Sequence, residues 1–117
     1  MKLGFSVISI SDFREWLTSG PAVSWSSAWR DGRITSIVIH LNELFGDDSG
    51  RKTFIKWAFG ASSVKELGDR ELARLWQWLG PRRDKDTGEW VIREQCQRTA
   101  AVVSRALRIE AGQQELL

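Results

Sequence analysis

Few side chains in this sequence have the type and spacing that catalysis requires. His40, the one histidine, lies within the apolar stretch ITSIVIHLNELF, where a packed histidine is more common than a catalytic one. Cys96 falls on the apolar face of an expected helix, where cysteine behaves as a small hydrophobic residue. Asp47 and Asp48 are adjacent in a polar turn, which suits helix capping better than an acid–base pair or a metal site. We therefore expect no catalytic residue and a protein that is not an enzyme.

Motifs for cofactors and metals are also missing from the sequence. One cysteine and one histidine cannot supply the ligands of a Cys/His zinc site, and a single cysteine cannot form an internal disulfide. The ten glycines are scattered and form neither GxxxxGK[ST] nor GxGxxG. We therefore expect no cofactor and no metal ion.

Positive charge gathers in the last third of the chain. Residues 82–108 contain seven cations and four acids, a local charge of +3 against +2 for the whole chain. Such a patch can follow a phosphate backbone, and an exposed Trp90 can stack on a base. A solvated helix face has the same composition, so both interpretations stay open. The candidate nucleic-acid-binding residues are Arg82, Arg83, Lys85, Trp90, Arg93, Arg98, Arg105 and Arg108.

Tryptophan is unusually frequent, with seven residues and no tyrosine. Each indole N–H needs a partner when it is buried, so a small core cannot hold all seven cheaply. Most of them are expected in the core or at its boundary. Alternatively, two or three form a partner-binding patch, because tryptophan is enriched at binding hot spots. The candidates for such a patch are Trp16, Trp25, Trp29 and Trp78.

Length and composition indicate one globular domain. The chain has 117 residues, 42% hydrophobic and 27% charged, which excludes a multidomain enzyme and wholesale disorder. No apolar run approaches the roughly 18 to 20 residues of a transmembrane helix. The N-terminal MKLGFSVISISDF reaches Asp12 too early for a secretory signal and shows no cleavage site. We therefore expect a cytoplasmic protein with no membrane partner.

The N-terminal third is predicted to hold an extended arm and one short helix. Residues 2–10 alternate in the two-residue period of a strand, but no second strong strand is present to pair with them. Ser11 or Asp12 is the expected N-cap of a helix that runs through Leu17 and ends before Gly20 and Pro21.

Helical periodicity dominates the middle of the chain. A turn at Asp31 and Gly32 is expected to precede a helix that ends at Gly46. The β-branched run ITSIVI would also suit a strand, but the helical period persists for twelve residues. The apolar faces of this helix and the next two predict a core of Ile37, Leu41, Leu44, Phe54, Phe59, Leu72, Leu75 and Leu79.

Capping residues delimit the next elements. A short helix is predicted between Asp47 and Gly60, and Ser63 with Glu66 fits the capping box of a brief helical turn. Asp69 is the expected N-cap of a further helix. Gly80 and Pro81 are expected to end that helix.

The C-terminal part is predicted to be a charged loop and then a long amphipathic helix. Residues 81–89 have no large apolar side chain and carry six charges, whereas residues 90–111 show helical periodicity. The predicted basic face contains Arg93, Gln97, Arg98, Arg105 and Arg108. The predicted apolar face contains Val91, Ile92, Cys96, Thr99, Val102, Val103, Ala106, Leu107 and Ile109.

The segment IVIHLNELFGDDSGRKTFIKWAFGASSVKELGDRELARLWQWL resembles the GemA family of regulatory proteins from Mu-like phages. That family combines a helix with a histidine, an LG-x-D-D turn, an R-x-x-[LF] helix and FG-x-x-S-x-K-[ED]-L. Here Phe45 and Gly46 stand where the family has LG, and the N-terminal and C-terminal parts lie outside the pattern. The matching positions are Ile37, Ile39, His40, Leu44, Gly46, Asp47, Asp48, Arg51, Phe54, Phe59, Gly60, Ser63, Lys65, Glu66, Leu67, Asp69, Leu72 and Leu79.

This resemblance implies a small phage or mobile-element protein that takes part in DNA transactions, through DNA itself or through a protein that handles it. Together with the residue patterns, it predicts an all-α single domain of four or five helices around one core. The expected parts are a Trp-rich arm and short helix (1–33), a GemA-like module (34–80), a charged loop (81–89) and a basic amphipathic helix (90–111).

Two functions from different classes follow from this organisation. We expect a non-enzymatic regulatory protein that binds single- or double-stranded DNA through the C-terminal loop and helix. The alternative is an adaptor or inhibitor that acts on a host protein through exposed tryptophans. Self-association is compatible with both.

Overall fold

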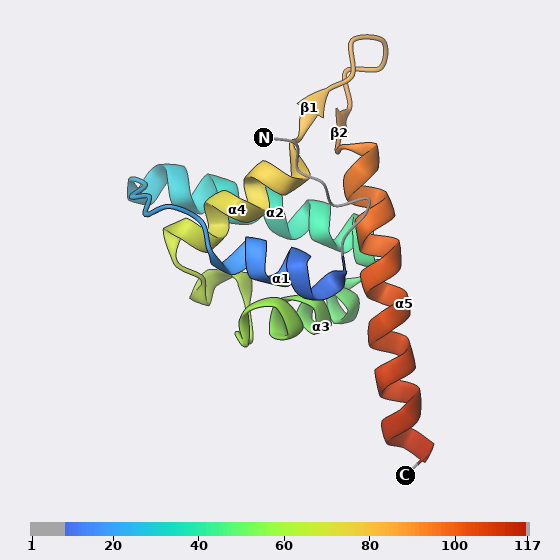
Figure 1. Ribbon diagram of the computed structural model, residues 1–117. Helices are drawn as coiled ribbons and strands as arrows, with labels where there is room; N and C mark the ends of the chain where they lie inside the picture. Colours follow the sequence, from blue (N-terminus) through green and yellow to red (C-terminus); the bar gives the residue numbers. More distant parts are fainter. Residues whose placement is uncertain (1–8, 117) are drawn as a thin grey trace.

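The computed structural model describes residues 9–116, and side-chain environments as far as residue 108. The predicted fold class is confirmed: the chain forms a compact, mostly helical domain (Figure 1). Within the described residues it has five α-helices, one short 3-10 helix and a small two-stranded hairpin. The elements are α1 (Ile10–Thr18), α2 (Ser27–Phe45), α3 (Asp48–Phe59), η2 (Val64–Glu66), α4 (Asp69–Leu79), β1 (Arg82–Arg83), β2 (Trp90–Val91) and α5 (Glu94–Leu116).

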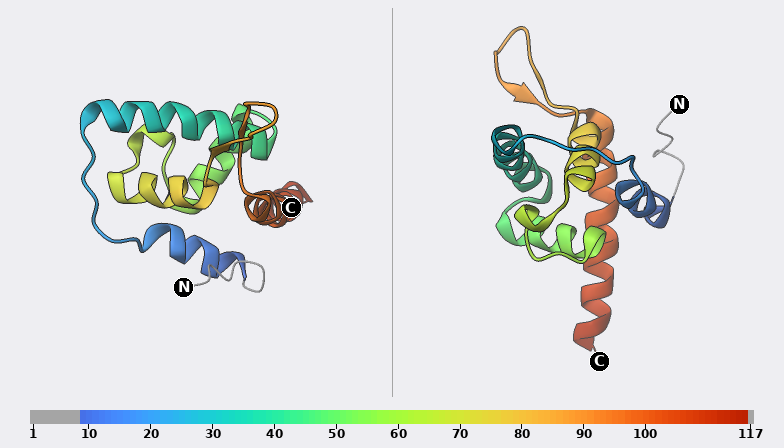
Figure 2. Two further views of the ribbon diagram at one scale, coloured as in Figure 1. Left: turned by 90° about the horizontal axis from the view of Figure 1, so that it is seen from above. Right: turned by 90° about the vertical axis from the view of Figure 1, so that its left-hand side faces the viewer.

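The core lies where α1, α2, α3 and α4 converge. Seen from above, α4 lies between α2 and α1, and α5 is viewed nearly end-on beside them (Figure 2). The ring of Phe13 packs against those of Trp78 and Phe54, with centroid distances of 4.9 and 6.5 Å. Of the predicted core, Leu44 and Phe59 are only partly buried and pack against its edge. The other six are buried, namely Ile37, Leu41, Phe54, Leu72, Leu75 and Leu79.

Helix α2 begins at Ser27, before the predicted turn at Asp31 and Gly32. Ser26 is its N-cap and accepts a hydrogen bond from the backbone N–H of Trp29 at 3.3 Å. The predicted turn at Asp31 and Gly32 is therefore wrong, and both residues lie within the helix. A glycine inside a helix costs about 1 kcal/mol relative to alanine, which is small enough for capping and tertiary contacts to outweigh.

The starts of α1 and α4 also differ from prediction. Ser9, not Ser11 or Asp12, caps α1 by accepting a hydrogen bond from the N–H of Asp12. The N-cap of α4 is Gly68, and Asp69 is the first helical residue, so the predicted role of Asp69 is wrong. Residues 2–8 of the predicted extended arm lie outside the described residues, whereas Ile10 belongs to α1.

The turn before α4 is helical, as predicted, but its capping box does not form. The Ser63 side chain makes no capping hydrogen bond. Instead, the Glu66 carboxylate accepts a hydrogen bond from the backbone N–H of Ser62 at 2.9 Å. Gly46, Gly60 and Gly80 follow α2, α3 and α4 with positive φ, so all three predicted helix ends are confirmed.

Residues 82–91 form an antiparallel hairpin instead of a plain loop followed by helix. Arg82 pairs with Val91 and Arg83 with Trp90. The Asp84 carboxylate accepts two backbone hydrogen bonds in the turn, and Gly88 adopts a φ of 71°. Trp90 and Val91 suit a strand, and α5 consequently begins at Glu94 rather than at residue 90.

The apolar face of α5 is narrower than predicted. Cys96, Ala100 and Val103 are buried, and Leu107 packs against the edge of the core. Val102 is 58% exposed, because it lies about 100° around the helix from Val103. None of the helices in the described part of the chain is long and apolar enough to cross a membrane.

Candidate nucleic-acid interface

The packing of α5 turns its arginines away from the core. Cys96 and Val103 are 1% and 0% exposed, and they fix which side of the helix faces α2. Arg98 and Arg105, seven residues apart, lie on the opposite side, and Arg108 follows one turn later. We call these three exposed residues, Arg98, Arg105 and Arg108, the α5 arginine stripe. The predicted basic face of this helix is thereby confirmed over residues 98–108.

Among the residues whose side chains the structure describes, charge on the α5 arginine stripe is only weakly neutralised. Arg98 forms an ion pair with Glu94 at 2.8 Å, but the two side chains are 73% and 77% exposed. Such surface pairs contribute roughly 0 to 1 kcal/mol and exchange partners readily. Among the described residues, Arg105 and Arg108 have no ion-pair partner.

The hairpin presents a second group of cations next to the start of α5. Arg82, Arg83 and Lys85 are exposed, and the hairpin projects from the helical body (Figure 1). Antiparallel pairing places Arg83 beside Trp90, and its guanidinium carbon lies 5.0 Å from the centre of the indole ring. Asp84 also lies in the hairpin, with two further acids, so the hairpin by itself has no net charge.

Arg93 joins the hairpin to α5 and has a structural role. Its N–H donates to the carbonyl of Leu79 at 3.2 Å, and its own carbonyl accepts from the N–H of Cys96 at 3.0 Å. The guanidinium lies directly against Gly80, where any side chain would overlap it. The backbone of Arg93 therefore fixes the junction between the hairpin and α5, and its side chain stays exposed.

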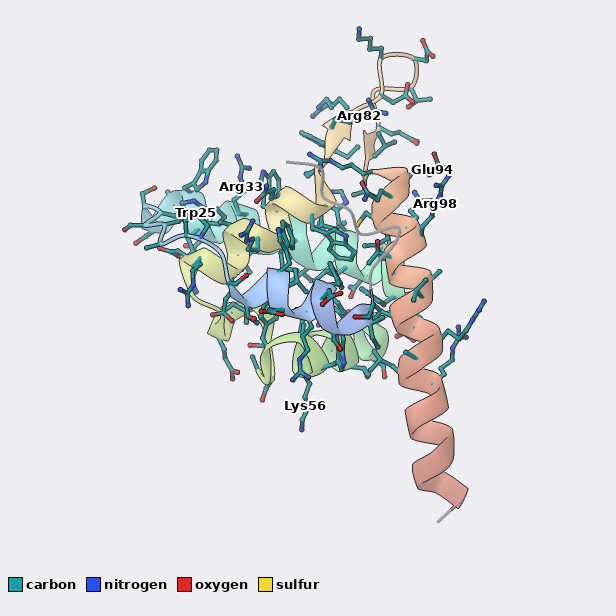
Figure 3. The ribbon with its side chains drawn as sticks, viewed as in Figure 1. Trp25, Arg33, Lys56, Arg82, Glu94 and Arg98 are labelled. Carbon is teal, nitrogen blue, oxygen red and sulfur yellow. The ribbon has the colours of Figure 1, made fainter. Side chains whose placement is uncertain are left out.

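The predicted interface residues thus fall into two neighbouring groups. Figure 3 shows Arg82 on the hairpin, and Glu94 and Arg98 on the first turns of α5, with the rest of the helix running away from the hairpin. The cations of residues 82–85 and those of the α5 arginine stripe therefore border one end and one side of the same long helix.

Most of the tryptophans predicted to form an exposed patch are not free. Trp78 lies in the core at 2% exposure and cannot contact a partner. Trp16 and Trp25 are partly buried against the core. Trp29 is 49% exposed. Of the four tryptophans in the predicted patch, only Trp29 is therefore well exposed, and Trp16 and Trp25 are accessible in part.

Trp29 also belongs to a stacked arrangement that was not predicted from the sequence. The Arg33 guanidinium lies between two indole rings, 3.6 Å from the centre of Trp29 and 4.3 Å from that of Trp76. Trp29 and Arg33 are four residues apart, a spacing that brings side chains together on a helix. The sequence did not predict this contact because the predicted helix began after Trp29.

An unpredicted contact ties the segment before α2 to the start of α4. The Asp69 carboxylate accepts hydrogen bonds from the backbone N–H of Trp25 at 2.9 Å and from Arg30 at 2.7 Å. Arg30 also donates to the carbonyls of Leu67 and Lys65. The hydrogen bond from Trp25, followed by the contact with Arg30, lowers the pKa of Asp69 below its usual value.

Cys96 and His40 lie inside the protein. Burial raises the pKa of the Cys96 thiol, and the charge of Arg93 offsets only part of this effect. His40 is 4% exposed, as expected of a packed histidine. No group of three or more His, Cys, Asp or Glu side chains is placed to hold a metal ion in the part of the chain that the structure describes.

Comparison with protein-family models, with curated proteins and with solved structures finds no match. The resemblance to the GemA family therefore rests on the sequence motifs alone.

Proposed function

We propose that this protein binds nucleic acid through the α5 arginine stripe and the adjoining hairpin, as a small non-catalytic factor in DNA transactions. The observation that carries the proposal is the orientation of α5, whose buried Cys96, Ala100 and Val103 leave Arg98 and Arg105 exposed on the opposite side, with Arg108 exposed at the flank. The GemA resemblance supports the same class of function and suggests a phage or mobile-element setting.

The dimensions of the stripe suit a phosphate backbone. Arg98 and Arg108 are ten residues apart, which is about 15 Å along a helix. Phosphates of one DNA strand follow each other at about 3.4 Å along the duplex axis while the strand winds around it, so a straight stripe of this length reaches only a few of them. Phosphate contacts of this kind position a protein without reading sequence.

The hairpin adds contacts at the end of the stripe. Arg82, Arg83 and Lys85 extend the positive surface, and Trp90, which is 53% exposed, offers a ring on which an unpaired base can stack. With stacking on Trp90, single strands should bind more strongly than they would through phosphate contacts alone.

Salt dependence tests the proposal, because each arginine that binds a phosphate releases about one counterion. Affinities for duplex and single-stranded DNA are measured by fluorescence anisotropy at several salt concentrations, for the wild type and for Arg98→Gln/Arg105→Gln/Arg108→Gln. The slope of log K against log salt should become shallower by about 0.7 to 0.9 for each arginine–phosphate pair removed, or roughly 2 to 3 units for the triple variant.

A matched control separates the stripe from net charge. The exposed residues Lys52, Lys56 and Lys65 lie on α3 and η2, and changing them to Gln removes the same total charge. The control should keep most of the wild-type slope. If the wild type fails to bind at low salt, or if both triple variants show the same reduction in slope, the proposed interface is wrong.

A further inference from the structure

The exposed side of α2 borders a groove that shares Trp90 with the proposed nucleic-acid interface but is otherwise lined by residues outside it. Two hollows of about 600 and 460 Å³ adjoin each other, since Glu43 and Trp90 line both of them. Ile39 lines the first hollow and Ile92 lines the second. We call this surface, lined by Ile39, His40, Glu43, Glu89, Trp90 and Ile92, the α2–hairpin groove.

Apolar side chains flank the α2–hairpin groove on both sides. Ile39 on α2 is 52% exposed and Trp90 on β2 is 53% exposed. They are two of the four large hydrophobic residues that are exposed in the described part of the chain. Exposed apolar residues that gather around one hollow mark an interaction surface more strongly than scattered ones do.

The charge of the α2–hairpin groove is opposite to that of the α5 arginine stripe. Its lining includes the carboxylates of Glu43 and Glu89, whereas neither hollow is lined by lysine or arginine. Arg83 is the cation at the rim, stacked on Trp90 and donating to the carbonyl of Gly88 rather than to either carboxylate. Phosphates would be repelled here, and a cationic side chain would be attracted.

A buried polar atom beneath the groove lacks a partner. His40 lines the first hollow, and its Nδ1 atom makes no hydrogen bond to any residue that the structure describes. The Glu43 carboxylate is 3.7 Å from this nitrogen, which is too long for a direct hydrogen bond. Buried polar atoms are nearly always satisfied, and the Glu43 carboxylate at the edge of the groove is the nearest charged group to this nitrogen.

We infer that the α2–hairpin groove binds an extended peptide segment of a partner protein in which arginine or lysine alternates with apolar side chains. The cations pair with Glu43 and Glu89, and the apolar side chains pack on Ile39 and Trp90. A hollow of about 600 Å³ lies within the range of roughly 300 to 1,000 Å³ that is typical of ligand sites. This surface differs from the tryptophan patch that the sequence predicts for a protein partner.

Nuclear magnetic resonance with defined peptides tests the inference. The ¹⁵N-labelled protein is titrated with an acetylated, amidated hexapeptide that alternates leucine with arginine, and separately with one that alternates leucine with glutamate. The arginine peptide should shift the backbone amides of Ile39 and Glu43 and the indole N–H of Trp90 until saturation. The glutamate peptide should leave these signals unchanged.

Variants distinguish the groove from general charge attraction. The double substitution Glu43→Lys/Glu89→Lys should weaken binding of the arginine peptide at least about tenfold, a change of 1.4 kcal/mol in binding free energy. Both side chains are exposed, so the melting temperature serves to confirm that the fold is kept. Arg105→Gln/Arg108→Gln should bind this peptide as the wild type does, whatever its affinity for DNA.

Several results would overturn the inference. Shifts confined to other surfaces, equal binding of the two peptides, or unchanged affinity in Glu43→Lys/Glu89→Lys would each remove the groove as a site for a cationic peptide. Concentration-dependent shifts of the Ile39 and Trp90 signals without peptide would show that a second copy occupies the groove instead.

Discussion

Two glycines inside helices should respond in opposite ways to the same substitution. Gly32 in α2 is exposed, and a methyl group added there would meet no atom within 4 Å. Gly50 in α3 faces the end of α2, where an added methyl group would overlap the carbonyl oxygen of Phe45 and lie 3.0 Å from its carbonyl carbon and Cβ. Only the second position therefore has a steric reason to be glycine.

The magnitudes follow from helix propensity and from crowding. Replacing glycine by alanine in a helix interior stabilises it by about 0.8 to 1.0 kcal/mol, so Gly32→Ala should raise the free energy of unfolding by that amount. In Gly50→Ala the same gain is opposed by displacement of the Phe45 backbone, whose ring stacks on Phe54 with centroids 4.5 Å apart. Overpacking costs roughly 1 to 3 kcal/mol, which makes the net effect destabilising.

Thermal and urea unfolding of the wild type and the two variants, followed by circular dichroism, would measure this difference. For a domain of this size, 1 kcal/mol corresponds to a shift of about 4 °C in Tm. We expect Tm to rise by about that amount in Gly32→Ala and to fall in Gly50→Ala. A loss of stability in Gly32→Ala would indicate that Asp31 and Gly32 form a turn in solution. Equal gains in both variants would refute the close packing of α3 against α2.

Three further predictions concern α5 and the contact between Trp25 and α4. Val103→Ala should destabilise the protein by about 2 kcal/mol in urea unfolding, whereas Val102→Ala, one residue away but 58% exposed, should change stability by less than about 0.5 kcal/mol. Because the folded protein lowers the pKa of Asp69 from its usual 3.8, the carboxylate contributes stability above that pH and loses it as pH falls through the lowered value. Asp69→Asn should therefore lower Tm at neutral pH, and the difference from wild type should shrink in acid; a constant difference would contradict this role. The raised pKa of the Cys96 thiol predicts slow alkylation by iodoacetamide in the folded protein and fast alkylation in denaturant, as judged by mass spectrometry.

The candidate interface was predictable where it depends on the period of one helix. Arg98 and Arg105 recur at a spacing that places them opposite Cys96 and Val103, and Arg108 falls at the flank of that face, so their exposure follows from the sequence. The groove was not predictable in the same way. Its lining comes from α2 and from a hairpin some fifty residues later, and no local pattern brings these two segments together.

The ends of α2, α3 and α4 were set by the sequence itself. Gly46, Gly60 and Gly80 adopt positive φ at low cost, and this preference acts within a single residue. The buried faces of the same helices follow from the spacing of their apolar residues, because burial on one side of a regular helix repeats with its period.

Only the tertiary structure decided what Asp69 does, whereas the Ser26 cap of α2 and the hairpin turn at Asp84 are local features. The Asp69 carboxylate accepts hydrogen bonds from Trp25 and Arg30, which are 44 and 39 residues away in the chain. These long-range hydrogen bonds replace the local capping bond that the sequence predicts. Capping preferences are worth about 1 kcal/mol, so a few contacts between distant segments are enough to override them.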